Sequence, residues 1–163
     1  MKNMNNCCNI PQSKDSLAIR NRICPHDGTK GKAIQLITLK SLLKPEALET
    51  LEPEQSYSFC SSSECPIVYF SNHGHTFIKD DLKVPVFQKD TNSEVPICYC
   101  FNWTRQRIRT EIEQQGESQV VASITAHVKA GRCGCEVNNP QGACCLGNVR
   151  RVLENLKLEQ IGF

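Results

Sequence analysis

Cysteine is the residue type with the most capacity for chemistry in this sequence. The 163 residues contain 11 cysteines in two groups, separated by a cysteine-free stretch from His75 to Ile97. The members are Cys7, Cys8, Cys24, Cys60 and Cys65 in the first group, and Cys98, Cys100, Cys133, Cys135, Cys144 and Cys145 in the second. Cysteine thiolates bind zinc and iron–sulfur clusters, and in an oxidising compartment thiols pair as disulfides.

The N-terminus decides between these two chemistries. It reads MKNMNNCCNIPQSKD and lacks the apolar stretch of a secretory signal. No apolar run approaches the roughly 18 residues of a membrane span. We therefore expect a cytoplasmic protein, in which disulfides are rare and cysteines are metal ligands or redox groups.

Charge and residue pattern exclude further classes of function. A formal net charge of +2 and 6% aromatic residues give no basic stripe for nucleic acid. No nucleophile–base pair typical of an enzyme stands out. The sequence leaves the oligomeric state undetermined.

Helices are expected to position the second group of cysteines. Three cysteine pairs fall between segments with helical periodicity, which are Thr104–Gln115, Ser118–Ala130 and a third that carries Val149, Val152, Leu153 and Leu156. Thr104 can cap the first of these helices and Gly116 can end it. Helix starts carry free N–H groups and favour thiolates, so the three pairs can converge on an iron–sulfur cluster. A zinc site built from the same cysteines is the alternative.

Short strands are expected to position the first group. The candidate strands are Ala33–Ile37, Tyr57–Cys60, Ile67–Phe70 and Thr76–Lys79, with a short helix over Thr38–Leu43. Cys60 and Cys65 form a C-x4-C pair between two strands, and the segment around Cys24 is their candidate partner. Tetrahedral zinc takes two ligands from each of two such turns.

These elements predict an α+β fold with two small domains. Residues 1–21 form a polar tail, residues 22–95 a β-rich, zinc-ribbon-like domain, and residues 96–163 a helical domain that carries the candidate iron–sulfur cluster site. The boundary is placed in the polar stretch Lys89–Glu94, just before Pro96.

Several motifs resemble the CopZ-type copper metallochaperones, which contain zinc and a 2Fe–2S cluster. These motifs are VPICYCFNWTRQRIRTEI (95–112), KAGRCGCEVNNPQGACCLGNV (129–149), SYSFCSSSECPIVYF (56–70) and the C-P-x-x-G-x-x-G pattern from Cys24 to Gly31. The second half is also similar to the bacterioferritin-associated ferredoxins.

This resemblance implies specific ligands. For the cluster it implies Cys98, Cys100, Cys135 and Cys145, with Cys144 as the alternative to Cys145 and no assigned role for Cys133. For zinc it implies Cys24, Cys60 and Cys65. Related zinc turns carry a cysteine where this chain has Asp27, so the fourth ligand is Asp27, His26, Cys7 or Cys8, and Asp27 is preferred.

The resemblance also implies a role in copper handling, with a copper-transport or redox protein as partner. The C-x-x-C motif that carries Cu(I) in that family does not occur in this sequence. We therefore expect a metallochaperone-related protein that carries single electrons in metal homeostasis. It is not a conventional enzyme, although a metal-reducing activity such as supplying an electron to Cu(II) is compatible with it. The alternative is an interaction module in which both metals only stabilise the fold.

Overall fold

The protein is described here as a computed structural model, in which residues 22–162 are placed. The first half contains β1 (Lys32–Ile34), α2 (Leu36–Leu42), α3 (Pro45–Leu48), β2 (Tyr57–Phe59), β3 (Ile67–Ser71), β4 (Thr76–Ile78) and the short 3-10 helices η1 (Lys79–Asp81) and η2 (Phe87–Lys89). The second half contains β5 (Pro96–Cys98), β6 (Trp103–Thr104), α4 (Arg105–Gln115), α5 (Val120–Lys129), α6 (Cys135–Asn138) and α7 (Leu146–Ile161).

An antiparallel sheet in the order β1-β2-β3-β4 organises the first half. In its register Ser58 of β2 is paired with Ala33 of β1 and with Phe70 of β3. The tight turn around Gly74, which has a φ of +86°, connects β3 to β4. All residues of the central strands β2 and β3 are buried. Most of these residues are apolar or aromatic, and Ser58 and Ser71 are the buried polar exceptions.

Two short helices cover the sheet and complete its core. Leu39 of α2 and Leu43, the residue that follows this helix, pack with Ala47 of α3 against aromatic residues of the sheet. The aromatic members of this core are Tyr57, Phe59, Tyr69 and Phe77. Pro45 stands at the first position of α3, where its fixed φ suits a helix start.

The second half is a helical layer around a small hairpin. The hydroxyl of Thr104 accepts a hydrogen bond from the backbone N–H of Arg107 at 3.0 Å and so caps α4, and Gly116 ends this helix with a φ of +81°. The core contains Ile108 and Ile112 of α4, Val120 and Ile124 of α5, and Val149, Val152 and Leu156 of α7, together with Ile97, Cys98, Trp103 and Cys145.

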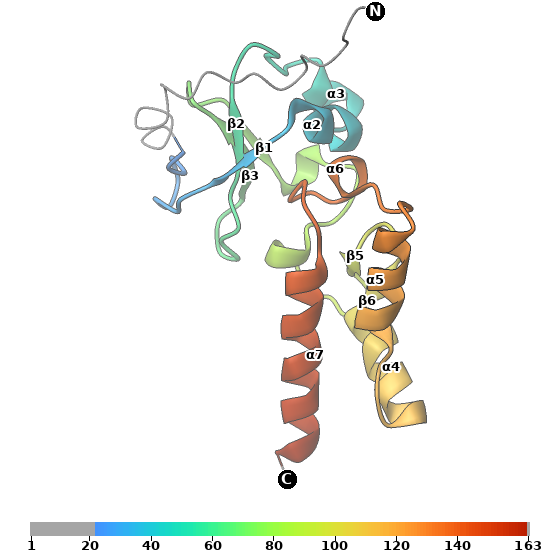
Figure 1. Ribbon diagram of the computed structural model, residues 1–163. Coiled ribbons are helices and arrows are strands. Elements are labelled where there is room, and N and C mark those ends of the chain that lie inside the picture. The colour runs from blue at the N-terminus through green and yellow to red at the C-terminus, as the bar shows by residue number, and fades with distance from the viewer. Residues whose placement is uncertain (1–21, 163) are drawn as a thin grey trace, which may run out of the picture.

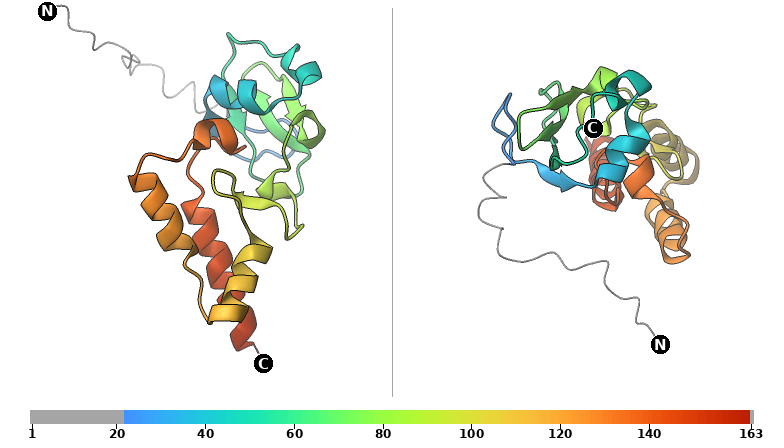
Figure 2. Two further views of the ribbon diagram at one scale, coloured as in Figure 1. Left: turned by 90° about the vertical axis from the view of Figure 1, so that its right-hand side faces the viewer. Right: turned by 90° about the horizontal axis from the view of Figure 1, so that it is seen from above.

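The two halves lie end to end and touch along α6. Figure 1 shows the sheet with α2 and α3 at one end and α4, α5 and α7 extending toward the other, and both views in Figure 2 agree with this arrangement. The short α6 contacts α2. None of the helices within residues 22–162 has the length and apolar character that crossing a bilayer requires.

The predicted α+β class is confirmed, and the β-rich first half contains an antiparallel sheet. The expected strand Ala33–Ile37 is wrong in its second part, since Leu36 and Ile37 begin α2. The elements that were not expected are the four-residue helices α3 and α6, the hairpin strands β5 and β6, and the 3-10 helices η1 and η2. The largest cores draw on residues 39–86 and 97–156, and a domain boundary at residue 95 stays a prediction. The tail 1–21 lies outside the described residues.

Candidate metal centres

Four potential ligands meet beside the sheet. Donor atoms of Cys24, Asp27, Cys60 and Cys65 all lie within 4.8 Å of one another. The sulfurs of Cys24 and Cys65 are 3.7 Å apart, and the Cys60 sulfur is 4.0 Å from Asp27 Oδ1. Two thiolates at about 2.3 Å from one tetrahedral zinc would be about 3.8 Å apart. The donor set therefore has the size of a four-coordinate site.

Two turns deliver these ligands. Cys24 and Asp27 lie in the loop closed by the bridge between Ile23 and Lys30. In this loop the N–H of Cys24 donates to the carbonyl of Thr29 at 2.8 Å. Gly28 takes a φ of +75°, a conformation that favours glycine directly after a ligand.

Cys60 and Cys65 flank the connection between β2 and β3. The N–H of Cys60 donates to the carbonyl of Val68 at 2.9 Å, so the ladder of the sheet continues to this ligand. Cys24, Cys60 and Cys65 are buried with Ile67 and Phe70 in a small core of their own. The site therefore has three ligands that the fold itself holds in place.

Burial raises the pKa of two of the thiols, whereas hydrogen bonding lowers the pKa of the carboxylate. Burial raises the pKa of the Cys60 thiol to about 12 and also raises the pKa of Cys24. The backbone N–H of Thr29 donates to the Asp27 carboxylate at 3.0 Å and holds the pKa of that exposed group well below its usual value. Without a cation the thiols of Cys24 and Cys60 keep their protons, whereas Asp27 is ionised, so a metal ion would displace protons from these two sulfurs.

Lys89 supplies a positive charge next to these ligands. Its ammonium group is buried and donates to the backbone carbonyls of Ser62 at 2.6 Å and Cys65 at 2.9 Å. Burial lowers the pKa of Lys89, and the neighbouring thiols and Asp27 oppose that shift. Sequence reasoning missed this residue because it stands in a polar stretch that is typical of a loop.

The alternative candidates for the fourth zinc ligand are His26, Cys7 and Cys8. The Nδ1 atom of His26 is 3.6 Å from the Cys65 sulfur, but His26 is exposed and lies outside the set of mutually close donors. Cys7 and Cys8 lie outside the described residues. Among the described residues Asp27 is thus the acidic group that the structure brings to the three thiols.

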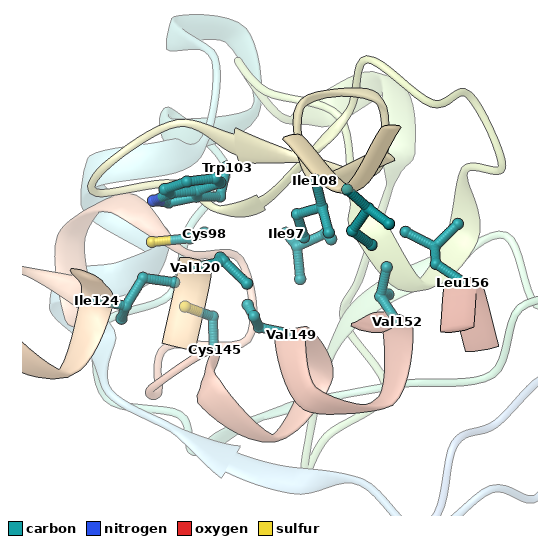
Figure 3. Close-up of a cluster of buried hydrophobic side chains, with 11 residues drawn as sticks. Ile97, Cys98, Trp103, Ile108, Val120, Ile124, Cys145, Val149, Val152 and Leu156 are labelled. Atoms are coloured by element: carbon teal, nitrogen blue, oxygen red, sulfur yellow. The ribbon is translucent and has the colours of Figure 1, made fainter. Parts of the chain in front are cut away.

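Four cysteines of the second half form two sulfur pairs. Cys98 and Cys145 are buried in the helical core, and the sulfurs of Cys100 and Cys135 are 3.9 Å apart. Figure 3 shows Cys98 and Cys145 on the same side of that core, with the indole of Trp103 next to Cys98. The four residues that the motifs indicated are therefore neighbours in space.

Short elements aim these thiols. Cys98 ends β5 and Cys100 lies in the turn to β6, while Cys135 begins α6 and Cys145 is the residue before α7. The Cys100 sulfur accepts hydrogen bonds from the N–H of Gly134 at 3.3 Å and from the side-chain amide of Asn138 at 3.5 Å. Such donors stabilise a thiolate and tune a bound cluster.

The cysteines of the two sulfur pairs differ in how readily they lose a proton. A hydrogen bond from the Cys145 thiol lowers the pKa of Cys98 to about 7 and raises that of Cys145. Burial raises the pKa of Cys135 to about 12. Cys98 therefore loses its proton more readily than Cys135 or Cys145, and the positive charge of Arg107 favours the same state.

Arg107 and Trp103 shield the first pair from solvent. The guanidinium of Arg107 lies 3.6 Å from the centre of the Trp103 ring and donates to the carbonyls of Phe101 at 3.0 Å and Asn102 at 3.2 Å. Asn102 takes a φ of +53°, which is uncommon for a residue other than glycine. The hydrogen bonds of Arg107 therefore stabilise a turn in an uncommon backbone conformation. Arg107 is itself exposed, and no motif in the sequence points to these contacts.

The two remaining cysteines of this half are more accessible. Cys144 is exposed and Cys133 is half-buried. Both are close enough to Cys135 for their charges to raise its pKa. The side chain of Cys145, in contrast, is 2% exposed, and this difference favours Cys145 over Cys144 as the inward-facing residue of the adjacent pair.

Comparisons with known proteins show what the chain is similar to. A family model for a CopZ zinc binding domain matches residues 21–83. The chain is 30% identical to the copper chaperone CopZ of Archaeoglobus fulgidus over 129 residues, which are 79% of this chain and 60% of that protein. It therefore spans less than two thirds of the length of this relative.

A solved structure is similar over nearly its whole length. The X-ray structure of the N-terminal domain of Archaeoglobus fulgidus CopZ has 30% sequence identity and a TM-score of 0.66 with this chain. The match covers 80% of this chain and 96% of that domain, and so includes most of both halves described above.

Proposed function

The chain belongs to the family of the CopZ N-terminal domain, and from this premise we propose that it binds one zinc ion and one 2Fe–2S cluster and carries single electrons in copper homeostasis. The zinc ligands in this proposal are Cys24, Asp27, Cys60 and Cys65. The cluster ligands are Cys98, Cys100, Cys135 and Cys145. A zinc- and metal-binding role, rather than enzymatic catalysis, is what the family match supports.

The zinc site suits a structural role. Three of its ligands are buried in a core between the two turns, which leaves no obvious open position for substrate. A small β-rich half with few apolar residues gains folding free energy from such a metal. Zinc has no redox chemistry, so this centre carries no electrons.

The arrangement of the second thiols in two pairs is the observation that carries the cluster proposal. Each iron of a 2Fe–2S cluster takes two protein thiolates, so its four ligands form two close pairs rather than one tight set. Cys100 and Cys135 are 3.9 Å apart, and Cys98 and Cys145 share a hydrogen bond. Within residues 22–162, no three of these four cysteines have sulfur atoms that all lie within 4.8 Å of one another, in contrast to the donors of the zinc site.

The protein's own residues would tune and protect such a group. When bound, a 2Fe–2S cluster accepts and returns one electron. Gly134 and Asn138 donate to the Cys100 sulfur, and the charge of Arg107 favours the ionised form of Cys98. Trp103, which is 5% exposed, keeps water away from Cys98.

Titration of anaerobically reconstituted protein with dithionite tests this function. We expect visible charge-transfer bands that bleach with one electron per chain and return on reoxidation. Protein reduced in this way should convert one Cu(II) to Cu(I) per chain, because one electron is given up and one is taken. Absence of bleaching would contradict the electron-carrier role.

A second function is supported by the burial of the ligands. Cys98 and Cys145 are part of the hydrophobic core, so the cluster could serve only to hold α7 and the hairpin together. This interaction module would contain both metals but would not be reduced reversibly. The copper-transport or redox partner that the name of the relative suggests for the electron carrier would then be a docking partner only.

A further inference from the structure

The segment between two of the proposed cluster ligands is fastened to the other half of the molecule. We call residues 136–144, between Cys135 and Cys145, the cluster loop. The hydroxyl of Tyr69 donates to the carbonyl of Pro140 at 2.7 Å, and that of Thr38 donates to the carbonyl of Glu136 at 2.6 Å. Both donors are 0% exposed and belong to the sheet half, from β3 and α2.

Close packing accompanies these hydrogen bonds. Gly142 in the cluster loop has a φ of +67°, and a Cβ there would lie 3.0 Å from Ile34 Cγ1 and 3.1 Å from Thr38 Oγ1. Only glycine combines that backbone conformation with so close an approach. Figure 1 shows the short α6, which begins at Cys135, lying next to α2.

The anchor on the sheet is directly connected to the proposed zinc site. Tyr69 follows Val68 in β3, and the carbonyl of Val68 accepts the N–H of Cys60. Cys65 stands two residues before the start of this strand. One strand therefore carries the zinc turn at its beginning and the support of the cluster loop near its end.

A four-residue helix and a turn do not hold their shape alone, because isolated helices of this length are not stable in water. The cluster loop needs outside contacts to present Cys135 and Cys145 at a fixed separation. Such contacts come from a buried surface of the sheet half, namely the hydroxyls of Tyr69 and Thr38 and the close packing of Ile34 against Gly142.

We propose that Tyr69 and Thr38 are positioning residues for the cluster site, through which the zinc-binding sheet holds the loop that carries Cys135 and Cys145. The inference rests on the proposed cluster. Because both metals then favour the same docked arrangement, loss of zinc should loosen the cluster, and loss of the two hydroxyls should loosen it without loss of zinc.

The test compares Tyr69→Phe and Thr38→Val with Tyr57→Phe in the anaerobically reconstituted full chain. Tyr57 is a buried tyrosine of the adjacent strand whose hydroxyl bonds to Glu52 and His75, so it controls for the loss of a buried hydroxyl in the same sheet. The readouts are the rate at which an iron chelator bleaches the visible bands, the zinc content, and the hydrogen exchange of residues 136–144.

Removing the Tyr69 hydroxyl leaves the buried carbonyl of Pro140 without its donor. The cost of an unpaired buried carbonyl corresponds to a change of about fivefold or more in the equilibrium between the docked and the undocked cluster loop. We expect Tyr69→Phe and Thr38→Val to bleach at least about fivefold faster than Tyr57→Phe, with zinc unchanged at one per chain and faster exchange confined to the cluster loop. Selective removal of zinc from the wild-type chain should accelerate bleaching in the same direction.

The outcomes separate the two proposals. A wild-type chain that takes up no iron and sulfide would refute the proposed function. The exchange of residues 136–144 in the zinc-loaded chain would still test the anchoring. Bleaching and exchange of both variants equal to those of Tyr57→Phe would overturn the inference while leaving the cluster in place.

Discussion

The ammonium group of Lys89 donates a 2.9 Å hydrogen bond to the backbone carbonyl of Cys65, and so places a buried positive charge against a ligand of the proposed zinc site. The same ammonium donates to the carbonyl of Ser62 and thereby spans the turn between Cys60 and Cys65. Three thiolates and a carboxylate carry more negative charge than one Zn²⁺ balances. A buried lysine at this place offsets part of the excess and joins η2 to the zinc turn.

Replacing Lys89 with methionine should therefore weaken the zinc turn. The substitution keeps the length of the side chain but leaves two backbone carbonyls without their donor, and we expect a loss of about 2–3 kcal/mol in the free energy of unfolding. Chemical denaturation of the zinc-loaded protein measures this loss. The matched control is Lys79→Met, since Lys79 is an exposed lysine near the same surface. Equal stability of the two variants would contradict the role of Lys89.

The fourth zinc ligand can be identified by a pair of substitutions in adjacent positions. Asp27→Asn should lower zinc affinity by about tenfold to a hundredfold because it removes an anionic donor and keeps the shape of the side chain. His26→Asn should leave the affinity within about twofold. Competition with a chromophoric chelator measures both. The opposite ranking would make His26 the ligand.

Zinc affinity should rise with pH. The pKa values of Cys24 and Cys60 are raised above the ordinary value of 9.0, so both are thiols in the metal-free chain at neutral pH. Each must lose a proton when zinc binds, which makes the logarithm of the affinity rise by at least about two for every pH unit between roughly pH 6 and 8. Asp27 adds no slope in that range because its pKa is lowered, so it is already ionised. An affinity independent of pH, measured by chelator competition, would contradict binding through these thiols.

Alkylation should divide the described cysteines into two classes. In the metal-loaded native protein, iodoacetamide followed by mass spectrometry should label Cys133 and Cys144 and leave the other seven unmodified. The seven are protected by metal bonds as well as by burial. Removal of the metals should expose Cys100 and Cys135 first, since they are only half-buried. Labelling of Cys100 at the rate of Cys144 in the loaded protein would argue against its role as a ligand.

The sequence predicted the elements whose signals are local. The cap Thr104 and the stop Gly116 predicted the observed bounds of α4, because both act through their immediate neighbours in the chain. The strand Ile67–Phe70 was predicted one residue short of its observed end. Apolar and β-branched residues occur without interruption in this strand, which is typical of one that is buried on both faces.

The errors occur where distant contacts decide the local structure. Leu36 and Ile37 follow Ile34 of β1 after the single polar residue Gln35, which resembles a continuing strand, but the packing of Leu39 and Leu43 on the sheet favours a helix that starts at Leu36. The helix α6 depends on a hydrogen bond from Thr38, which lies 98 residues away in the sequence. No pattern around Cys135 could reveal that partner.

In the candidate site too, the sequence predicted the residues that belong to local motifs and missed those that depend on distant contacts. The motifs indicated Cys24, Asp27, Cys60 and Cys65 together, and the structure places these four side chains within reach of one ion. Lys89 was missed because its role arises only when a polar segment folds back on the zinc turn. Arg107 was missed for the same reason, since its contacts are with the turn before α4.

The most direct test of two different metal centres is the metal and sulfide content of the protein purified under anaerobic conditions, combined with EPR of the reduced sample. We predict one zinc, two iron and two acid-labile sulfides per chain, and a signal of a single unpaired electron after reduction. Zinc should remain at one per chain in Cys98→Ser, while iron and sulfide are lost. A colourless protein that holds only zinc and folds fully would contradict this account.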